Sequence, residues 1–205
     1  PSNRRYHAES IACPDCGPTL SLHKADQSVI QTEDPISETA RLLKLGQIVA
    51  IKGLGGFHLA CDAENEEAVK LLRERKHRDE KPLAVMVQNV KIARKLCKVN
   101  HEEARALASA QAPIMLLRKK DELLAASIAP GNSRLGVMLP YTPLHHLLMH
   151  SGLQAVVMTS ANLSEEPIAI DNDEAFQRLA SIADYFLIHN RDIYLRCDDS
   201  VAAYW

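Results

Sequence analysis

From about residue 31 onward, short apolar runs alternate with segments whose apolar residues recur at helical spacing. The runs 48–51 and 155–159 are largely aliphatic, which is typical of strands buried on both faces of a sheet. Polar caps precede the amphipathic segments, as at Asp34 before Pro35 and at Asn65. Strands that alternate with helices predict an α/β domain. The expected strands are 48–51, 57–61, 83–87, 114–117, 134–139, 155–159 and 185–188, with 193–196 as an edge strand, and the expected helices are 36–45, 65–75, 90–96, 100–110, 142–149 and 173–179.

The same pattern divides the chain into two parts. We interpret residues 31–205 as one α/β domain with a mixed, twisted sheet and flanking helices, and residues 1–30 as the end of a cysteine-pair module with its linker. Hydrophobic residues make up 46% of the chain and aromatic residues only 4%, so we expect a core of Leu, Ile, Val and Ala.

Charge and apolar content limit the classes of function. A net charge of −2 argues against general affinity for nucleic acid or anionic membranes, because such affinity comes from uncompensated Lys and Arg. No apolar run approaches the ~20 residues of a membrane-spanning helix, and the N-terminus lacks the order of a signal peptide. We therefore expect a cytoplasmic protein in which any phosphate site is local.

Cysteine usage favours a reducing compartment and one metal site. Five cysteines with a single close pair do not form a disulfide framework. Cys13 and Cys16 lie in a Cys-Pro-Asp-Cys turn of the kind that presents two thiolates to one Zn²⁺. His7 and His23 are candidates to complete the tetrahedron, and a second cysteine pair outside this chain is an equally good alternative. A small buried or half-buried side chain is the favoured interpretation for the remaining cysteines, Cys61, Cys97 and Cys197.

Two polar segments far apart in the sequence carry the strongest indication of function. Residues 75–82 place Arg and Lys side chains at a helix end and in the turn beyond it, and residues 159–162, Thr-Ser-Ala-Asn, follow an expected strand. Cations together with neutral hydrogen-bonding groups suit a polyphosphate. Each segment alone has an ordinary alternative, a charged helix terminus for the first and a simple turn for the second. The hypothesis therefore requires the two segments to meet in space.

The glycine-rich segment 53–56, Gly-Leu-Gly-Gly, leaves two interpretations open. Such loops let backbone amides approach a phosphate, but no Gly-Lys-Ser/Thr follows and the next residues resemble a strand. The alternative is a tight connection between two strands that needs positive backbone dihedral angles.

Several short motifs follow one another in the order Leu45-Gly46, Cys61-Asp62-Ala63, Lys76-x-Arg78-x-x-Lys81-Pro82-Leu83, Leu135-Gly136-Val137 with Pro140, and Thr159-Ser160-Ala161-Asn162. In this order they resemble the YrdC-type domain, whose members bind ATP and form an acyl-adenylate. The resemblance covers nearly the whole chain from Ile36 onward, and it implies a YrdC-like α/β fold.

The segments 140–148 and 189–201, together with 6–8 and 12–18, narrow the resemblance. They are similar to the middle of the HypF family, carbamoyltransferases of [NiFe]-hydrogenase maturation, in which a zinc module precedes the YrdC-like domain. The resemblance implies three steps. An upstream acylphosphatase-like domain releases carbamate from carbamoyl phosphate, the YrdC-like domain joins carbamate to ATP and releases pyrophosphate, and a downstream domain passes the carbamoyl group to the partner HypE. Only the middle step could reside in this chain.

The resemblance also implies roles for single residues. The basic motif would clamp the phosphates, the Ser-x-Asn motif would bond phosphate or acyl oxygens, and no general base is needed because carbamate is already an anion. The implied cofactors are ATP, Mg²⁺ and Zn²⁺, with Cys13 and Cys16 as zinc ligands. The implied catalytic residues are Lys76, Arg78, Ser160 and Asn162, and the implied nucleotide-binding residues are Lys76, Arg78, Lys81, Thr159, Ser160, Asn162, Arg191 and Ser200, with Arg196 as an extension.

Four further side chains have open interpretations. Asp198 and Asp199 are candidates to hold Mg²⁺ between phosphates, and an edge-strand turn is an equally good reading. His145 and His146 are candidates to face the nucleotide, although a His near a helix start is more often structural or solvated.

The substrate prediction rests on a departure from the wider family. Members that activate carboxylated threonine for tRNA modification carry Thr- and Tyr-containing residues where this chain has residues 53–58. A pocket without those hydroxyls favours bare carbamate. The alternatives are a threonylcarbamoyl-AMP synthase, a non-catalytic module that binds double-stranded RNA or a nucleotide, and a redox or metal switch at the cysteine pair.

Overall fold

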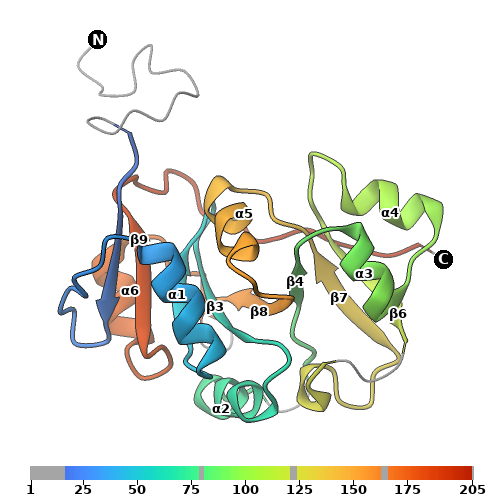
Figure 1. The fold of residues 1–205 in the computed structure, drawn as a ribbon, viewed down its shortest axis with the longest axis horizontal. Coiled ribbons are helices and arrows are strands. Elements are labelled where there is room, and N and C mark those ends of the chain that lie inside the picture. The colour runs from blue at the N-terminus through green and yellow to red at the C-terminus, as the bar shows by residue number, and fades with distance from the viewer. Residues whose placement is uncertain (1–16, 79–80, 121–123, 163–165, 205) are drawn as a thin grey trace.

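The computed structural model describes residues 17–78, 81–120, 124–162 and 166–204. In these residues one ten-stranded mixed sheet has the strand order β1-β9-β2-β3-β8-β4-β7-β6-β10, and β5 pairs with β6 (Figure 1). The predicted α/β class is confirmed. The strands are β1 (Leu20–Lys24), β2 (Val49–Lys52), β3 (Phe57–Asp62), β4 (Val85–Val87), β5 (Cys97–Lys98), β6 (Ile114–Lys119), β7 (Arg134–Met138), β8 (Ala155–Ser160), β9 (Tyr185–His189) and β10 (Val201–Ala202).

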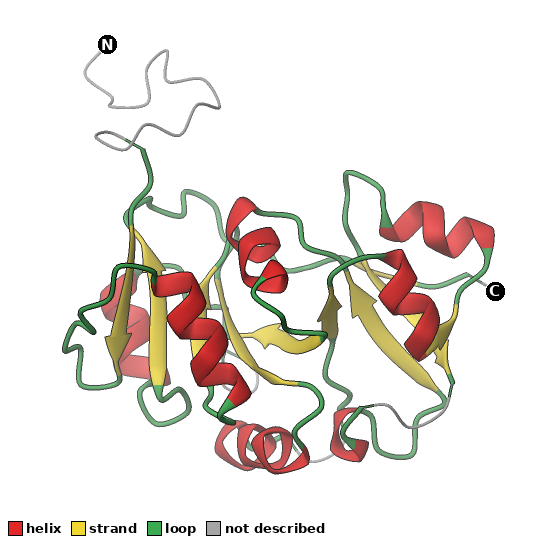
Figure 2. Cartoon of the chain, in the orientation of Figure 1, coloured by secondary structure: helices red, strands yellow, loops and turns green. Residues whose placement is uncertain are grey.

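Helices cover both faces of the sheet, because its central strands are apolar on both sides (Figure 2). Ile51 and Ala60 belong to the cluster that packs against α1 and α5, whereas Ala50 and Leu59 belong to the cluster that includes α2 and α6. This division follows from the alternation of side chains along a strand. The helices are α1 (Pro35–Lys44), α2 (Glu66–Lys76), α3 (Val90–Leu96), α4 (His101–Leu107), α5 (Pro143–His150) and α6 (Asn172–Leu179), with a short 3-10 turn η1 (Ala126–Ile128).

The predicted helix starts are confirmed by their caps. The Asp34 side chain accepts hydrogen bonds from the first turn of α1, and the Asn65 side chain does the same for α2. Asn100 and Glu103 form a reciprocal capping box at α4. Each cap satisfies backbone N–H groups that have no partner inside the helix, so a local sequence signal determines where each helix begins.

Two strands differ from the expectation. β1 lies in the segment that we assigned to the small module, and it pairs with β9 in antiparallel fashion over its whole length. The division of the chain into domains stays a prediction. The edge strand expected at 193–196 was wrong, since these residues form no strand and Tyr194 is 100% exposed. The edge strand is instead β10, which pairs with β6 in parallel.

The C-terminal tail, residues 190–202, connects the two ends of the sheet, from β9 to β6 (Figure 1). On the way Cys197 donates its N–H to the carbonyl of Gly55, and the carbonyl of Ser200 accepts from Ile114 at 2.7 Å. The tail therefore brings late residues to the middle of the sheet. Among the described residues, none of the helices has the length and apolar character needed to cross a membrane.

Candidate functional site

The turn after α2 is held in place by an arginine that the sequence hypothesis did not use. Helix α2 ends at Lys76 because His77 adopts a left-handed φ of 50°. The Arg73 guanidinium then donates to the carbonyl of Arg78 at 2.6 Å and to that of Lys81 at 3.2 Å. Arg73 is only 8% exposed. Its role could not be foreseen, because it depends on the course of the turn it contacts.

Lys76 joins this turn to the segment 160–162, which we call the Ser-Ala-Asn corner. Its ammonium donates to the carbonyl of Ser160 at 2.8 Å, to Oδ1 of Asn162 at 3.0 Å and to the carbonyl of Asn162. The Ser160 hydroxyl also donates to Oδ1 of Asn162 at 2.9 Å. The two polar segments therefore meet, as the hypothesis required.

Lys76 stabilises the corner from inside the protein. It is only 3% exposed, and its contacts with three oxygens match the three donors of an ammonium group. Burial, with repulsion by Arg78 and Lys81, lowers the pKa of Lys76 to about 8. In this arrangement the lysine positions Ser160 and Asn162 and does not line the cleft beside them.

Arg78 and Lys81 do line that cleft, which has a volume of about 650 Å³ and which we call the central cleft. The Arg78 guanidinium donates to the Thr159 hydroxyl at 3.2 Å and to the carbonyl of Pro82 at 2.8 Å. Its planar group therefore lies between the turn and strand β8. The cleft combines cations, hydroxyls and amides from distant segments: Arg78, Lys81, Asn132, Ser133, Arg134, Thr159, Ser160 and Asn162, with Asp198 and Asp199 from the tail.

Other residues of the predicted site lie elsewhere. Arg75 forms an ion pair with Asp184 at 2.7 Å, away from the cleft. Arg191 and Ser200 are not among the residues that line the central cleft, and Arg191 bonds through its backbone N–H to the His189 ring at 3.3 Å. The roles assigned to Arg191 and Ser200 stay predictions.

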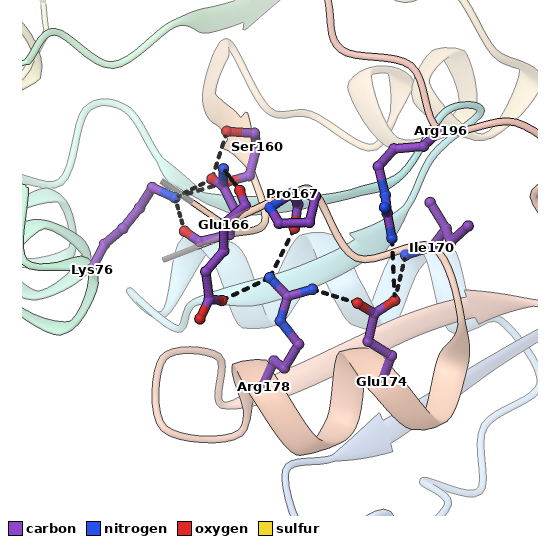
Figure 3. A network of polar contacts seen from close by, with 9 residues as sticks. Lys76, Ser160, Glu166, Pro167, Ile170, Glu174, Arg178 and Arg196 are labelled. Atoms are coloured by element: carbon purple, nitrogen blue, oxygen red, sulfur yellow. Dashed lines mark hydrogen bonds and ion pairs between the residues drawn. The ribbon is translucent and has the colours of Figure 1, made fainter. Parts of the chain in front are cut away.

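A polar network continues from the corner into α6 (Figure 3). The Asn162 side-chain amide donates to the carbonyl of Glu166 at 2.7 Å. The Arg178 guanidinium donates to the Glu166 carboxylate at 2.8 Å and also to the carboxylate of Glu174. Arg196 from the tail lies 3.8 Å from Glu174. The network attaches the corner to a helix at one end and to the tail at the other.

The structure groups His145 and Asp199, which the sequence offered for separate roles, with His58 and Tyr141, which sequence reasoning missed. We call these four residues the histidine–aspartate cluster. Asp199 accepts from His58 at 2.9 Å and from the Tyr141 hydroxyl at 3.0 Å. Burial raises the pKa of Asp199, but hydrogen bonds and electrostatic attraction, mainly from His58 and then from Tyr141, outweigh it and lower the pKa overall. The carboxylate is therefore ionised where it lines the cleft.

His145 completes this cluster but does not line the central cleft. Its ring is wholly buried, with its edge toward Tyr141 at 4.6 Å between ring centroids and toward His58 at 6.1 Å. Neither ring nitrogen has a hydrogen-bond partner among the described residues. Burial, followed by repulsion from His58, lowers the pKa of His145 to about 3. The ring is therefore neutral at physiological pH.

The glycine-rich segment is a tight connection between β2 and β3, and its glycines are required by close packing. Gly53 donates to the carbonyl of Gly56 at 2.9 Å. A Cβ on Gly55 would lie 2.3 Å from the carbonyl oxygen of Cys197, and one on Gly56 would lie 2.6 Å from Ile168. The expectation of positive φ angles here was wrong, because the positive-φ glycines are Gly46, Gly131 and Gly152.

Of the predicted metal ligands, only some lie among the described residues. Cys13 and Cys16 lie outside the described residues, and the described part of the chain contains no group of three or more His, Cys, Asp or Glu side chains arranged to hold a metal ion. His23 already contacts Ser21 and the carbonyl of Gln27 through its ring nitrogens. Cys61 and Cys97 are buried as expected, whereas Cys197 is exposed.

Residues 41–204 match the Sua5/YciO/YrdC family, which is described by the words telomere recombination. The chain belongs to this family. Residues 1–23 match the HypF finger. The resemblance to HypF is confirmed, since carbamoyltransferase HypF of Rhodobacter capsulatus is 50% identical over 98% of the chain. The chain spans only 27% of that relative.

Solved structures agree with this assignment. Full-length HypF in a phosphate- and nucleotide-bound form is 52% identical, with a TM-score of 0.89 over 98% of this chain and 26% of that protein. E. coli YciO shares the fold alone, with 18% identity and a TM-score of 0.70 over 82% of this chain and 83% of that protein. A more distant relative, threonylcarbamoyl-AMP synthase of Bacillus subtilis, is 28% identical over 67% of the chain and 41% of its own length.

Proposed function

We propose that this chain catalyses formation of carbamoyl-adenylate from ATP and carbamate, with release of pyrophosphate. The observation that carries the proposal is the contact of the cationic turn with residues 159–162, in which Lys76 bonds the Ser-Ala-Asn corner and Arg78 bonds Thr159, beside a cleft of about 650 Å³. The 50% sequence identity with the matching part of a carbamoyltransferase also supports this proposal.

The reaction needs positioning more than acid–base chemistry. A carbamate oxygen attacks the α-phosphorus of ATP, a new phosphorus–oxygen bond forms, and the bond to the β-phosphate oxygen breaks as pyrophosphate leaves. Both reactants are anions, so the protein must hold them together and neutralise their charge. Arg78 and Lys81 supply positive charge at the cleft, and Ser160 and Asn162 supply neutral hydrogen-bonding groups.

Carbamate would be released from carbamoyl phosphate elsewhere in the complete protein, and the carbamoyl group would then pass to HypE for hydrogenase maturation. In this proposal, these steps would be carried out by an acylphosphatase-like domain and a C-terminal transfer domain of the complete protein. Zn²⁺ at the cysteine pair has a structural role in this proposal, because paired Cys thiolates are a donor set typical of closed zinc sites. Asp198 stays a candidate ligand for the Mg²⁺ that accompanies ATP, whereas Asp199, the other candidate, already accepts hydrogen bonds from His58 and Tyr141.

The experiment that tests the proposal is ATP–pyrophosphate exchange in the complete protein with radiolabelled pyrophosphate. We expect carbamoyl phosphate to stimulate exchange and threonine with bicarbonate to have no effect. The reverse pattern would assign this chain to the threonylcarbamoyl-AMP synthases, which are among its more distant relatives.

Binding to double-stranded RNA is the outcome that would favour a non-catalytic module. In a filter-binding assay we expect no retention of RNA at physiological salt, because the chain carries a net charge of −2. Tight binding that weakens steeply with salt, together with no exchange of pyrophosphate, would contradict the enzymatic proposal.

A further inference from the structure

Two carboxylates, those of Asp198 and Asp199, line the central cleft, and a phosphate site alone does not explain them. Arg78, Lys81 and Arg134 give the cleft positive charge, yet Asp199 lines it as well. A carboxylate repels phosphate oxygens and attracts N–H or O–H donors. The position of Asp199 therefore selects for a ligand that has a donor group as well as anionic groups.

Asp199 is held in a fixed orientation. Each of its oxygens accepts one hydrogen bond, from His58 at 2.9 Å and from Tyr141 at 3.0 Å, and its side chain is only 21% exposed. A carboxylate has about four lone-pair positions, so each oxygen can still accept one bond from a ligand in the cleft. Such a fixed acceptor discriminates between ligands better than a mobile one, because little entropy is lost when the ligand binds.

The sheet places this acceptor close to the Ser-Ala-Asn corner. His58 on β3 is paired directly with Ser160 on β8, and His58 bonds Asp199. Ser160 and Asp199 both line the central cleft. A small group that reacts beside Ser160 is therefore in the same cleft as the Asp199 carboxylate.

We propose that Asp199, oriented by His58 and Tyr141, accepts hydrogen bonds from the amino group of the acyl substrate and so selects carbamate over carboxylates without a donor. This inference rests on the proposed function. Carbamate carries two N–H donors at the end opposite its reacting oxygen, whereas acetate carries a methyl group there. A methyl group facing Asp199 would leave a partly buried carboxylate without a ligand donor, which a site built for hydrogen bonding rejects strongly.

Two adenylate analogues isolate this contact. In N-carbamoyl and N-acetyl sulfamoyl adenosine, an –NH–SO₂– group replaces the phosphate linkage, and the two compounds differ only in NH₂ against CH₃. Isothermal titration calorimetry of the chain with each compound and with ATP gives three dissociation constants. We expect the carbamoyl compound to bind about 30-fold more tightly than the acetyl compound. This ratio corresponds to roughly 2 kcal/mol, the contribution of one charge-assisted hydrogen bond.

Substitution of the acceptor should remove this preference. In Asp199→Asn the remaining amide oxygen keeps one acceptor and adds an unfavourable donor, so we expect the ratio to fall below about threefold while the dissociation constant for ATP changes less than about threefold. Tyr141→Phe removes one group that orients Asp199, and the ratio should then fall part of the way. The matched control is Asp192→Asn, the same substitution in the same tail at an exposed residue that does not line the cleft.

The outcomes separate the two proposals. If the unmodified chain binds ATP and shows the same affinity for the carbamoyl and the acetyl analogue, the role of Asp199 is refuted while the adenylation reaction still stands. A ratio that stays unchanged in Asp199→Asn, in a variant with an unchanged melting temperature, refutes it as well. If Asp199→Asn weakens ATP as much as the carbamoyl analogue, and Mg²⁺ titration restores neither, the carboxylate serves the nucleotide and the inference is wrong. Failure of the unmodified chain to bind ATP at all would instead overturn the proposed function.

Discussion

The Ser-Ala-Asn corner and the histidine–aspartate cluster are connected through the paired residues Ser160 and His58, yet they accommodate a buried polar group in opposite ways. At the corner, the Lys76 ammonium donates to three oxygens, and these hydrogen bonds stabilise its charged form. In the cluster, His145 is equally buried but neither of its ring nitrogens has a partner within the described residues. A buried ammonium must be hydrogen-bonded, whereas a buried imidazole can remain neutral. The stability of the corner therefore depends on the contacts of Lys76, and the stability of the cluster depends on His145 staying unprotonated.

The largest effect is expected when the buried lysine is removed. Lys76→Met leaves three oxygens without their donor, and each charge-assisted hydrogen bond contributes about 1.5–3 kcal/mol. Since removal of a buried charge offsets part of this loss, we expect about 3 kcal/mol less stability in urea unfolding and an ATP affinity at least about 100-fold weaker. The control is Lys70→Met on the same helix, where the side chain is 55% exposed. A loss below about 1 kcal/mol for Lys76→Met would mean that the corner forms without it.

The second test protonates the other region. His145 has a pKa of about 3 in the folded protein against an ordinary value of 6.5, so between these values the unfolded chain binds a proton that the folded chain does not. Stability therefore falls as pH decreases below 6.5. At pH 5 the expected loss relative to pH 7.5 is about 2 kcal/mol. His145→Leu should lose about 2 kcal/mol less than the unmodified chain over this interval, as measured by urea unfolding at both values. Equal losses would show that other groups cause the acid sensitivity.

A third test asks whether charge alone suffices at the cleft. Arg78 bonds Thr159 and Pro82 through two different nitrogens of one planar group, which a lysine cannot reproduce. We expect Arg78→Lys to bind ATP about tenfold more weakly, with stability changed by less than about 1 kcal/mol. Arg94→Lys on α3, outside the central cleft, is the matched control. Unchanged ATP affinity in Arg78→Lys would indicate that the site requires only a positive charge.

The smallest effect is expected at the outer end of the corner network. Arg178 links Glu166 to Glu174, but its side chain is 22% exposed, so solvent weakens these ion pairs. Arg178→Met should reduce stability by about 1 kcal/mol and ATP affinity by about threefold, since the segment after Asn162 becomes less well held. A stability loss as large as that of Lys76→Met would move the centre of the network from the corner to α6.

Much of the fold could be predicted because its signals are local. The caps at Asp34, Asn65 and Asn100 and the aliphatic runs of the central strands required only neighbouring residues to be interpreted. β1 and β10 could not be predicted, since short strands form only when the sheet supplies their partners. Residues 193–196 indicated a strand at a place where no described strand pairs with them, and Tyr194 and Leu195 are exposed.

The sequence by itself determined the α/β order, the positions of the basic turn and the Thr-Ser-Ala-Asn segment, and the family resemblance that connects them. Only the tertiary structure decided what each cation does: Arg73 braces the turn, Arg75 pairs with Asp184, Lys76 is enclosed by the corner, and Arg78 reaches the cleft. It also brought Asp199 to His58, 141 residues earlier in the chain. The physical reason is that a helix end is encoded within one turn, whereas the partner of a charged side chain depends on which distant backbone packs against it.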